Sequence, residues 1–256
     1  MDRLLFSSLA AAKTQSTVRA QLTNDLANVS TPGFKKSFNH VLLRAVKVVA
    51  DYGYQTRYQP TVASSNVVTL QPGRMNFTGR PLDVAMEANT VMGVITEDGQ
   101  TAFTRRGDIK IRSDGTLILG NNITVAGEGG EPILVPPETI ITISREGIIN
   151  STLADQPEAP PVPVGQLLLR DASEQVLARR KDGLYEPKGA NGGGGDFENG
   201  PESVSLQVGS LEGSNVSAIE AMVRLIDFSR SFESQINVIK ESKENDKTGA
   251  TMMRTS

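Results

Sequence analysis

The chain has 256 residues, of which 21% are charged, and its net charge is only -3, with acidic and basic residues interspersed. This composition lacks the concentration of Lys and Arg that nucleic-acid binding requires, so protein partners are the better expectation. The chain has no cysteine, which excludes disulfides, thiolate metal sites and cysteine nucleophiles.

The first predicted element is a long amphipathic helix over residues 3–29. Small or apolar residues recur along it at separations of 7, 7, 4, 4 and 3, on one helical face: Leu4, Ala11, Val18, Leu22, Leu26 and Val29. Thr31-Pro32-Gly33 ends the pattern, because the residue before a proline is biased toward extended backbone. Polar residues interrupt the first apolar stretch, so we expect retained structure and not a cleaved signal peptide.

Residues 34–72 give mixed signals. The apolar residues between Phe34 and Ala50 fit either a short helix or an extended arm, and both remain open. Tyr52, Tyr54 and Tyr58 follow in a polar setting. Because Tyr is enriched at protein interfaces, they indicate an arm that packs on a neighbouring subunit, with a mobile loop as an almost equal alternative. We predict a linker or extended arm over 36–72.

From Gly73 the pattern changes to short β-branched runs separated by turn residues, which predicts an antiparallel β domain over 73–211. Asp98-Gly99 and Asp114-Gly115 each separate two such runs and predict hairpins. A proline-rich spacer over 155–163 and a glycine-rich loop over 189–200 interrupt the series. Further strands are expected at 133–135, 140–144, 148–150, 164–170, 175–181 and 204–208.

A second long helix is predicted from about Val216 to Lys243, with Ser214 and Asn215 as N-cap candidates. One apolar series follows a 3-4-3-4-3 spacing with Ser229 in its gap, which favours a supercoiled partner: Met222, Leu225, Phe232, Ile236 and Ile239. If the two terminal helices pack only on each other, a second row stays exposed, formed by Ile219, Val223 and Ile226. That row predicts a further surface on another subunit.

The residue types argue against catalysis. His40 is the only histidine and lacks the neighbouring nucleophile of a hydrolytic triad, so a surface or hydrogen-bonded histidine is expected. Asp83 and Glu87 could form a glycosidase pair, but carboxylates in a β-rich segment are more often solvated. The run 127–130 lacks the lysine of a phosphate-binding loop. We predict no cofactor, metal, small-molecule substrate or nucleic acid, and no membrane-spanning segment.

Three groups of residues resemble the flagellar axial proteins, the family of rod, hook and hook-junction subunits. Ala27-Asn28-Val29-Ser30-Thr31-Pro32-Gly33-Phe34-Lys35 resembles the motif that ends their N-terminal helix. The runs 82–85, 104–108 and 114–117 resemble successive landmarks of their β domain in order and spacing. Leu211-Glu212-Gly213-Ser214-Asn215-Val216, with the apolar run that follows, is similar to the start of their C-terminal helix. The segment 88–93 departs from the glycine-rich turn and aromatic pair usual at that place.

The resemblance implies an α+β fold that is mainly β. Residues 1–35 and 212–256 would form a discontinuous α-helical coiled-coil domain, joined to a central antiparallel β domain of the rod/hook type. It also implies a structural subunit, not an enzyme, that polymerises with copies of itself and other rod proteins into the flagellar drive shaft. Length and both ends look most like proximal-rod members, with a distal-rod or hook-type protein as the alternative.

The resemblance further implies a location in the periplasmic part of the basal body. The chain would reach it through the flagellar type III export apparatus, without a cleaved signal peptide. The residues alone leave open a soluble β-rich carbohydrate-binding or hydrolytic protein with incidental helical ends. Because neither terminal helix can bury its apolar face alone, we expect both ends to be largely disordered in the free monomer and to fold on assembly.

Overall fold

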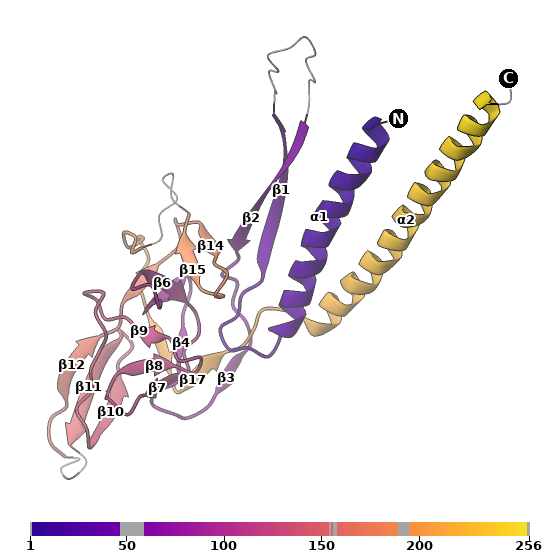
Figure 1. Ribbon diagram of the computed structural model, residues 1–256. Coiled ribbons are helices and arrows are strands. Elements are labelled where there is room, and N and C mark those ends of the chain that lie inside the picture. Colours follow the sequence, from indigo (N-terminus) through magenta and orange to yellow (C-terminus); the bar gives the residue numbers. More distant parts are fainter. Residues whose placement is uncertain (1, 47–58, 154, 156–157, 189–194, 255–256) are drawn as a thin grey trace. The chain divides into compact units, whose positions relative to one another are not determined.

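The computed structural model describes residues 2–46, 59–153, 155, 158–188 and 195–254, and it is mainly β with two long helices (Figure 1). The chain divides into two compact units. The terminal unit consists of Met1–Ala27, Asn39–Ser64 and Ser217–Ser256, and the β unit consists of Asn28–Phe38 and Ser65–Val216. Every strand pair with a defined register is antiparallel. The prediction of a mainly β chain with helical ends and antiparallel sheets is therefore confirmed.

The terminal unit contains α1 (Asp2–Ala27) and α2 (Ala218–Arg254), which contact each other. The helix α2 continues past the predicted end at Lys243, because no proline follows and the added residues are mostly good helix formers. The predicted N-cap at Ser214 or Asn215 is wrong. Ser217 caps the helix instead: its Oγ accepts a hydrogen bond from the Glu220 amide at 3.4 Å, and its carbonyl accepts one from the Ala221 amide at 2.9 Å.

The region left open between helix and arm is extended. The strands β1 (Ser37–Val46) and β2 (Gln59–Val68) are neighbours at one edge of the large sheet. The β-branched and small residues of these segments favour strands, which decides against the short helix. The predicted interface or loop at Tyr52, Tyr54 and Tyr58 lies outside the described residues.

The large sheet has the strand order β1-β2-β14-β15-β6-β5-β9-β8-β7, and β13 pairs with β5. Both predicted hairpins are confirmed: Asp98-Gly99 joins β5 to β6 and Asp114-Gly115 joins β7 to β8. Gly99 and Gly115 have positive φ, which the turns require. The strands are β5 (Thr90–Ile95), β6 (Thr101–Thr104), β7 (Ile109–Ile111), β8 (Leu117–Leu119), β9 (Thr124–Val125), β13 (Leu169–Asp171), β14 (Leu177–Arg179) and β15 (Tyr185–Pro187).

Three smaller sheets complete the β unit. One has the order β10-β11-β12, and the others are the pairs β16-β4 and β17-β3. Their strands are β3 (Met75–Phe77), β4 (Val84–Met86), β10 (Thr139–Ile143), β11 (Ile148–Leu153), β12 (Val162–Gln166), β16 (Leu206–Val208) and β17 (Ser210–Glu212). The predicted strand at 133–135 is wrong, since only an isolated bridge joins Leu134 to Thr116. The strand β12 begins inside the predicted proline-rich spacer.

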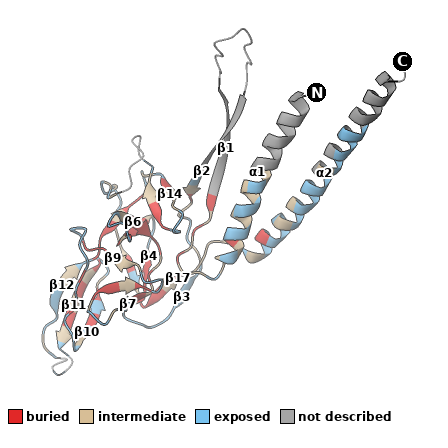
Figure 2. Ribbon diagram, viewed as in Figure 1, coloured by how far each residue is buried: buried red, intermediate tan, exposed pale blue. Residues whose placement is uncertain are grey.

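The core of the β unit lies between these sheets, where Figure 2 shows the buried residues concentrated along the strands. Its larger cluster includes Met86, Met92, Ile109, Leu117 and Leu167. A second cluster is built around Phe103, Leu168, Leu177 and Tyr185. The β unit begins at Asn28, directly after α1, and ends at Val216, shortly before α2.

Candidate functional site

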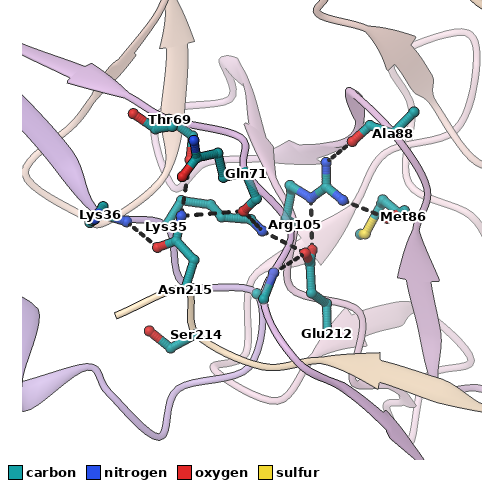
Figure 3. A network of polar contacts seen from close by, with 12 residues as sticks. Lys35, Lys36, Thr69, Gln71, Met86, Ala88, Arg105, Glu212, Ser214 and Asn215 are labelled. Carbon is teal, nitrogen blue, oxygen red and sulfur yellow. Dashed lines mark hydrogen bonds and ion pairs between the residues drawn. The ribbon is translucent and has the colours of Figure 1, made fainter. Parts of the chain in front are cut away.

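The two ends of the β unit meet in a buried ionic cluster, which we call the junction and define by Lys35, Arg105 and Glu212 (Figure 3). The Glu212 carboxylate accepts hydrogen bonds from Lys35 Nζ at 2.5 Å, from the Gly73 amide at 2.8 Å and from Arg105 Nε at 2.8 Å. The Lys35 and Glu212 side chains are 0% exposed, and Arg105 is 1% exposed. One carboxylate therefore ties together three segments that are far apart in sequence.

The remaining donors of the junction are also satisfied. Arg105 donates to the carbonyls of Met86 and Ala88, each at 2.5 Å, and Lys35 donates to the Gln71 carbonyl at 2.8 Å. Ala88 has a positive φ of 44°, and its carbonyl is one of the two that hold the Arg105 guanidinium.

The junction holds two cations and one carboxylate, an excess of one positive charge in a buried site. Burial, reinforced by the neighbouring Arg105 charge, lowers the pKa of Lys35 from 10.5 to about 8 despite its bond to Glu212. Because Arg stays charged at any ordinary pH, Lys35 is the member that can relieve the excess by losing a proton.

Asn215 joins the chain ends through both its backbone and its side chain. Its Oδ1 accepts from the Lys36 amide at 2.7 Å, and its Nδ2 donates to the carbonyls of Thr69 at 3.2 Å and Gln71 at 3.3 Å. Its own amide donates to the Phe34 carbonyl at 3.2 Å. These long-range bonds use the side chain that the sequence assigned to helix capping, and this explains why the N-cap moves to Ser217.

Gly33 brings the N-terminal segment into contact with the junction. Its amide donates to the Glu212 carbonyl at 2.7 Å, and its φ is +68°. A Cβ at this position would lie 2.2 Å from the Arg105 carbonyl oxygen, so no larger residue fits without moving the backbone. The buried Tyr185 hydroxyl donates to the Gly33 carbonyl at 3.2 Å, and burial raises the pKa of Tyr185 to about 12.

The residues around Gly33 form a tight turn, which Arg179 of β14 contacts. Thr31 donates its hydroxyl to Asn28 Oδ1 at 3.1 Å, and the Phe34 amide donates to the Thr31 carbonyl at 3.3 Å. The Arg179 guanidinium lies 4.3 Å from the Phe34 ring centroid and donates to the Lys35 carbonyl. Motif residues from both chain ends are thus brought together within the β unit.

Sequence reasoning missed the roles of this site. Lys35, Arg105 and Glu212 lie within runs that carried the resemblance, but no local pattern shows that their charges meet. Arg179 and Tyr185 were not singled out at all. No local signal distinguishes these residues, since Lys35 stands beside Lys36 and Arg105 beside Arg106.

The predicted helical interface residues have mixed exposure. Ile219 is 74% exposed, and Met222, Val223, Ile226 and Phe232 are also exposed. The half-buried positions are Val18, Leu22, Leu26, Val29, Leu225 and Ile236. The side chains of Leu4, Ala11 and Ile239 lie outside the described part of the chain. The assignment of these residues to subunit contacts stays a prediction.

The other candidate groups show no arrangement for catalysis. Glu87 is exposed and accepts from the Ser205 hydroxyl at 2.7 Å, whereas Asp83 is buried beside Arg80 at 3.3 Å, contrary to the expected solvation. His40 lies in β1. Within the described residues, no group of His, Asp and Glu is placed to hold a metal, and neither helix has an apolar stretch long enough to cross a membrane.

Comparisons with known proteins identify the family to which the chain is similar. Residues 207–252 match the family described as "Flagellar basal body rod FlgEFG protein C-terminal". The chain is 36% identical to "Flagellar basal-body rod protein FlgF" of Salmonella typhimurium, and the alignment covers 96% of each chain. It is 35% identical to FlgF of Escherichia coli, again over 96% of each. FlgG of Buchnera aphidicola from Schizaphis graminum is 31% identical, over 86% of this chain and 88% of that protein.

Proposed function

Since the chain belongs to the flagellar basal-body rod protein family, we propose that it is a structural subunit of the proximal rod. It polymerises with copies of itself and with other rod proteins into the drive shaft that transmits torque from the motor to the hook. The FlgF relatives of Salmonella typhimurium and Escherichia coli are 36% and 35% identical to the chain and the FlgG relative is 31% identical, which supports the proximal position over the distal alternative. The role is structural and requires no reaction.

The exposed apolar row on α2 carries the proposal that the helices assemble. Ile219, Val223 and Ile226 follow helical spacing and are exposed, although apolar side chains of this size gain from leaving water. Burying the three against neighbouring subunits would contribute on the order of 5 kcal/mol before ordering costs. In this proposal α1 and α2 form a coiled-coil domain, and the β unit forms an outer domain of the rod/hook type.

The junction gives this arrangement a mechanical connection. The segment after α1 is bound to Glu212 and Asn215, which both lie in the segment before α2. Along the chain, both helices therefore connect to segments that belong to the same packed β unit. We propose that this connection lets the helical and β parts of each subunit turn together.

The same proposal includes the route to the rod. The chain passes unfolded through the flagellar type III apparatus, without a cleaved signal peptide, and assembles in the periplasmic part of the basal body. Its ends stay largely disordered until neighbours cover them. Mild proteolysis of the purified chain tests this point: residues 1–30 and 215–256 should be cut well before the β unit, and equal resistance of both would contradict it.

The assembly itself is tested by changing Ile219, Val223 and Ile226 together to Ser. In cells without their own copy of this gene, the variant should be produced and exported but should leave the rod incomplete and the cells non-motile. Changing Arg230 and Glu233 to Ser alters the same helix at exposed polar positions and should preserve motility. Normal motility of the triple variant would refute the assembly role of the apolar row.

A further inference from the structure

The β unit carries an exposed segment of cationic and apolar residues that the junction and the helices do not use. Residues 74–80, which we call the ridge, have the sequence Arg-Met-Asn-Phe-Thr-Gly-Arg, and all seven are exposed. Met75 and Phe77 project on the same side of β3, and Phe77 is 83% exposed. Exposed Phe and Met between arginines are the composition of the centre of a protein interface.

The Phe77 ring packs against backbone on one side. Its ring lies against Gly209 and Gly79, since a Cβ added at these glycines would be 3.6 Å and 3.9 Å from ring atoms. The amides of Thr78 and Gly79 both donate to the Gly209 carbonyl, at 2.8 Å and 3.0 Å, which fixes the turn that presents the ring. A ring held in this way loses little conformational freedom when a partner covers its open face.

The charge of the ridge is positive. Arg80 pairs with the buried Asp83 at 3.3 Å, while Arg74 forms no ion pair among the described residues. The acid on the paired strand, Glu212, faces into the junction and is already bound to Lys35 and Arg105. A partner surface should therefore be apolar at its centre and acidic around it.

Such a surface exists on the same chain. Between residues 113 and 169 the only basic residue is Arg145, against seven acids: Asp114, Glu128, Glu131, Glu138, Glu146, Asp155 and Glu158. Leu153 and Val162 are 56% and 62% exposed in the sheet β10-β11-β12. Val162 pairs with Ser151, two residues from Leu153, so both lie on one face as diagonal neighbours.

Acids lie next to this apolar pair. Leu153 pairs with Thr139, which follows Glu138 directly, and the exposed Asp155 and Glu158 come shortly after Leu153. Among the residues that the structure describes, Glu138, Asp155 and Glu158 form no ion pair within the chain. We call Glu138, Leu153, Asp155, Glu158 and Val162 the acidic lobe.

We propose that the ridge of one subunit docks on the acidic lobe of a second copy of this chain. This inference rests on the proposed function, and it names a contact between β units that is separate from the helices. Within the β unit, β3 and the sheet β10-β11-β12 lie on different sides (Figure 1). A contact between two different surfaces is heterologous, so a pair of copies still has one free ridge and one free lobe, and the assembly continues without closing as a dimer.

The absence of cysteine allows a direct test of this contact in the assembled rod. Two full-length variants with different tags, Thr78→Cys on the ridge and Pro161→Cys beside the lobe, are produced together in cells without the native copy. After isolation of basal bodies and mild oxidation, we expect a disulfide-linked dimer with both tags. Each variant produced alone should give at least about tenfold less dimer, because like surfaces do not meet in a heterologous contact.

Charge reversal tests the chemistry of the contact. Arg74→Glu or Glu158→Lys alone should lower the yield of mixed dimer about tenfold at low salt, and both changes in every subunit should restore most of it. Lys181→Glu reverses a charge in an exposed turn elsewhere on the β unit and serves as the control. If the double reversal is no better than the single ones, electrostatic pairing of these surfaces is refuted.

The outcomes separate this inference from the function on which it rests. If the cysteine variants support motility and enter the rod, but mixed dimer does not exceed same-site dimer, the docking contact is wrong and the rod function stands. If the native chain is missing from the rod, both the function and the docking contact fail.

Discussion

Glu212→Gln and Lys35→Met are expected to affect the stability of the β unit very differently, although the two side chains touch. The junction holds one excess positive charge. Glu212→Gln raises that excess to two buried cations without a counter-charge, and loss of one partner from a buried pair costs about 3 to 5 kcal/mol. Lys35→Met instead leaves the neutral pair of Arg105 and Glu212.

The size of the effect of Lys35→Met follows from the contacts and from the pKa of Lys35. A lowering from 10.5 to about 8 means that folding opposes the charged amine by about 3 kcal/mol. Removal of Lys35 also leaves its partners bonded, since Glu212 keeps the Gly73 amide and the Gln71 carbonyl keeps Asn215 Nδ2. Lys35→Met should therefore change the free energy of unfolding by less than about 1 kcal/mol.

The same shift predicts a pH dependence. Between pH 8 and 10.5 the unfolded chain keeps the Lys35 proton while the folded chain loses it, so the free energy of unfolding increases with pH. From pH 7 to 9.5 this increase should be about 2 kcal/mol, and Lys35→Met should remove it.

Urea denaturation provides the assay, followed by the fluorescence of Tyr185 in a chain whose other three tyrosines are changed to Phe. Tyr185 then reports on the β unit alone, because it is buried in the second core cluster. The reasoning is refuted if Lys35→Met costs as much as Glu212→Gln. It is also refuted if the native protein becomes less stable from pH 7 to 9.5.

Three further predictions concern the segments around the junction. Gly33→Ala should cost at least about 2 kcal/mol more than Gly99→Ala in urea denaturation, because both have positive φ but only Gly33 meets backbone within 4 Å; equal costs would contradict the close approach. Asn215→Ala should lower the free energy of unfolding of the β unit by about 2 to 3 kcal/mol through its lost hydrogen bonds, while an Asn122→Ala control should cost less than half as much. Tyr185→Phe should lower the free energy of unfolding by about 1 kcal/mol at pH 7, measured by circular dichroism. Above pH 10 the native protein should lose stability, because Tyr185 ionises in the unfolded chain but not in the folded one, and the variant should not show this loss. If the variant loses stability above pH 10 as the native protein does, groups other than Tyr185 cause the loss.

Local patterns in the sequence predicted the elements that local interactions determine. The Asp-Gly pairs at 98–99 and 114–115 fix tight hairpins, because glycine adopts the positive φ that each turn needs. Proline at position 32 ends the first apolar stripe, and α1 stops at Ala27. The segment 133–135 shows the limit: its apolar residues fit a strand, but its pairing with residues 115–117 is a single bridge, in which the Leu117 amide donates to the Ile133 carbonyl and the Val135 amide donates to the Gly115 carbonyl.

The junction could not be predicted in the same way, because its contacts join residues 107 and 177 positions apart. Lys35, which follows Pro-Gly-Phe, is expected at the surface from the local sequence. Its burial depends on where the strands place Glu212. Asn215 shows how such contacts override a local preference. Its side chain is suited to capping a helix, yet four partners outside the helix occupy its amide and carboxamide groups.

In α2, unlike the junction, the sequence does predict a surface, because its periodicity shows which residues share a face. It does not show which group covers that face. Ile219, Val223 and Ile226 lie on one face because 3.6 residues complete each turn, whatever the surroundings. Burial in the junction depends on the fold of a single chain, whereas burial of this row depends on a second surface. Replacing Glu212 in the junction should therefore reduce the stability of the isolated protein. A substitution in the apolar row should leave that stability nearly unchanged and appear only when subunits assemble.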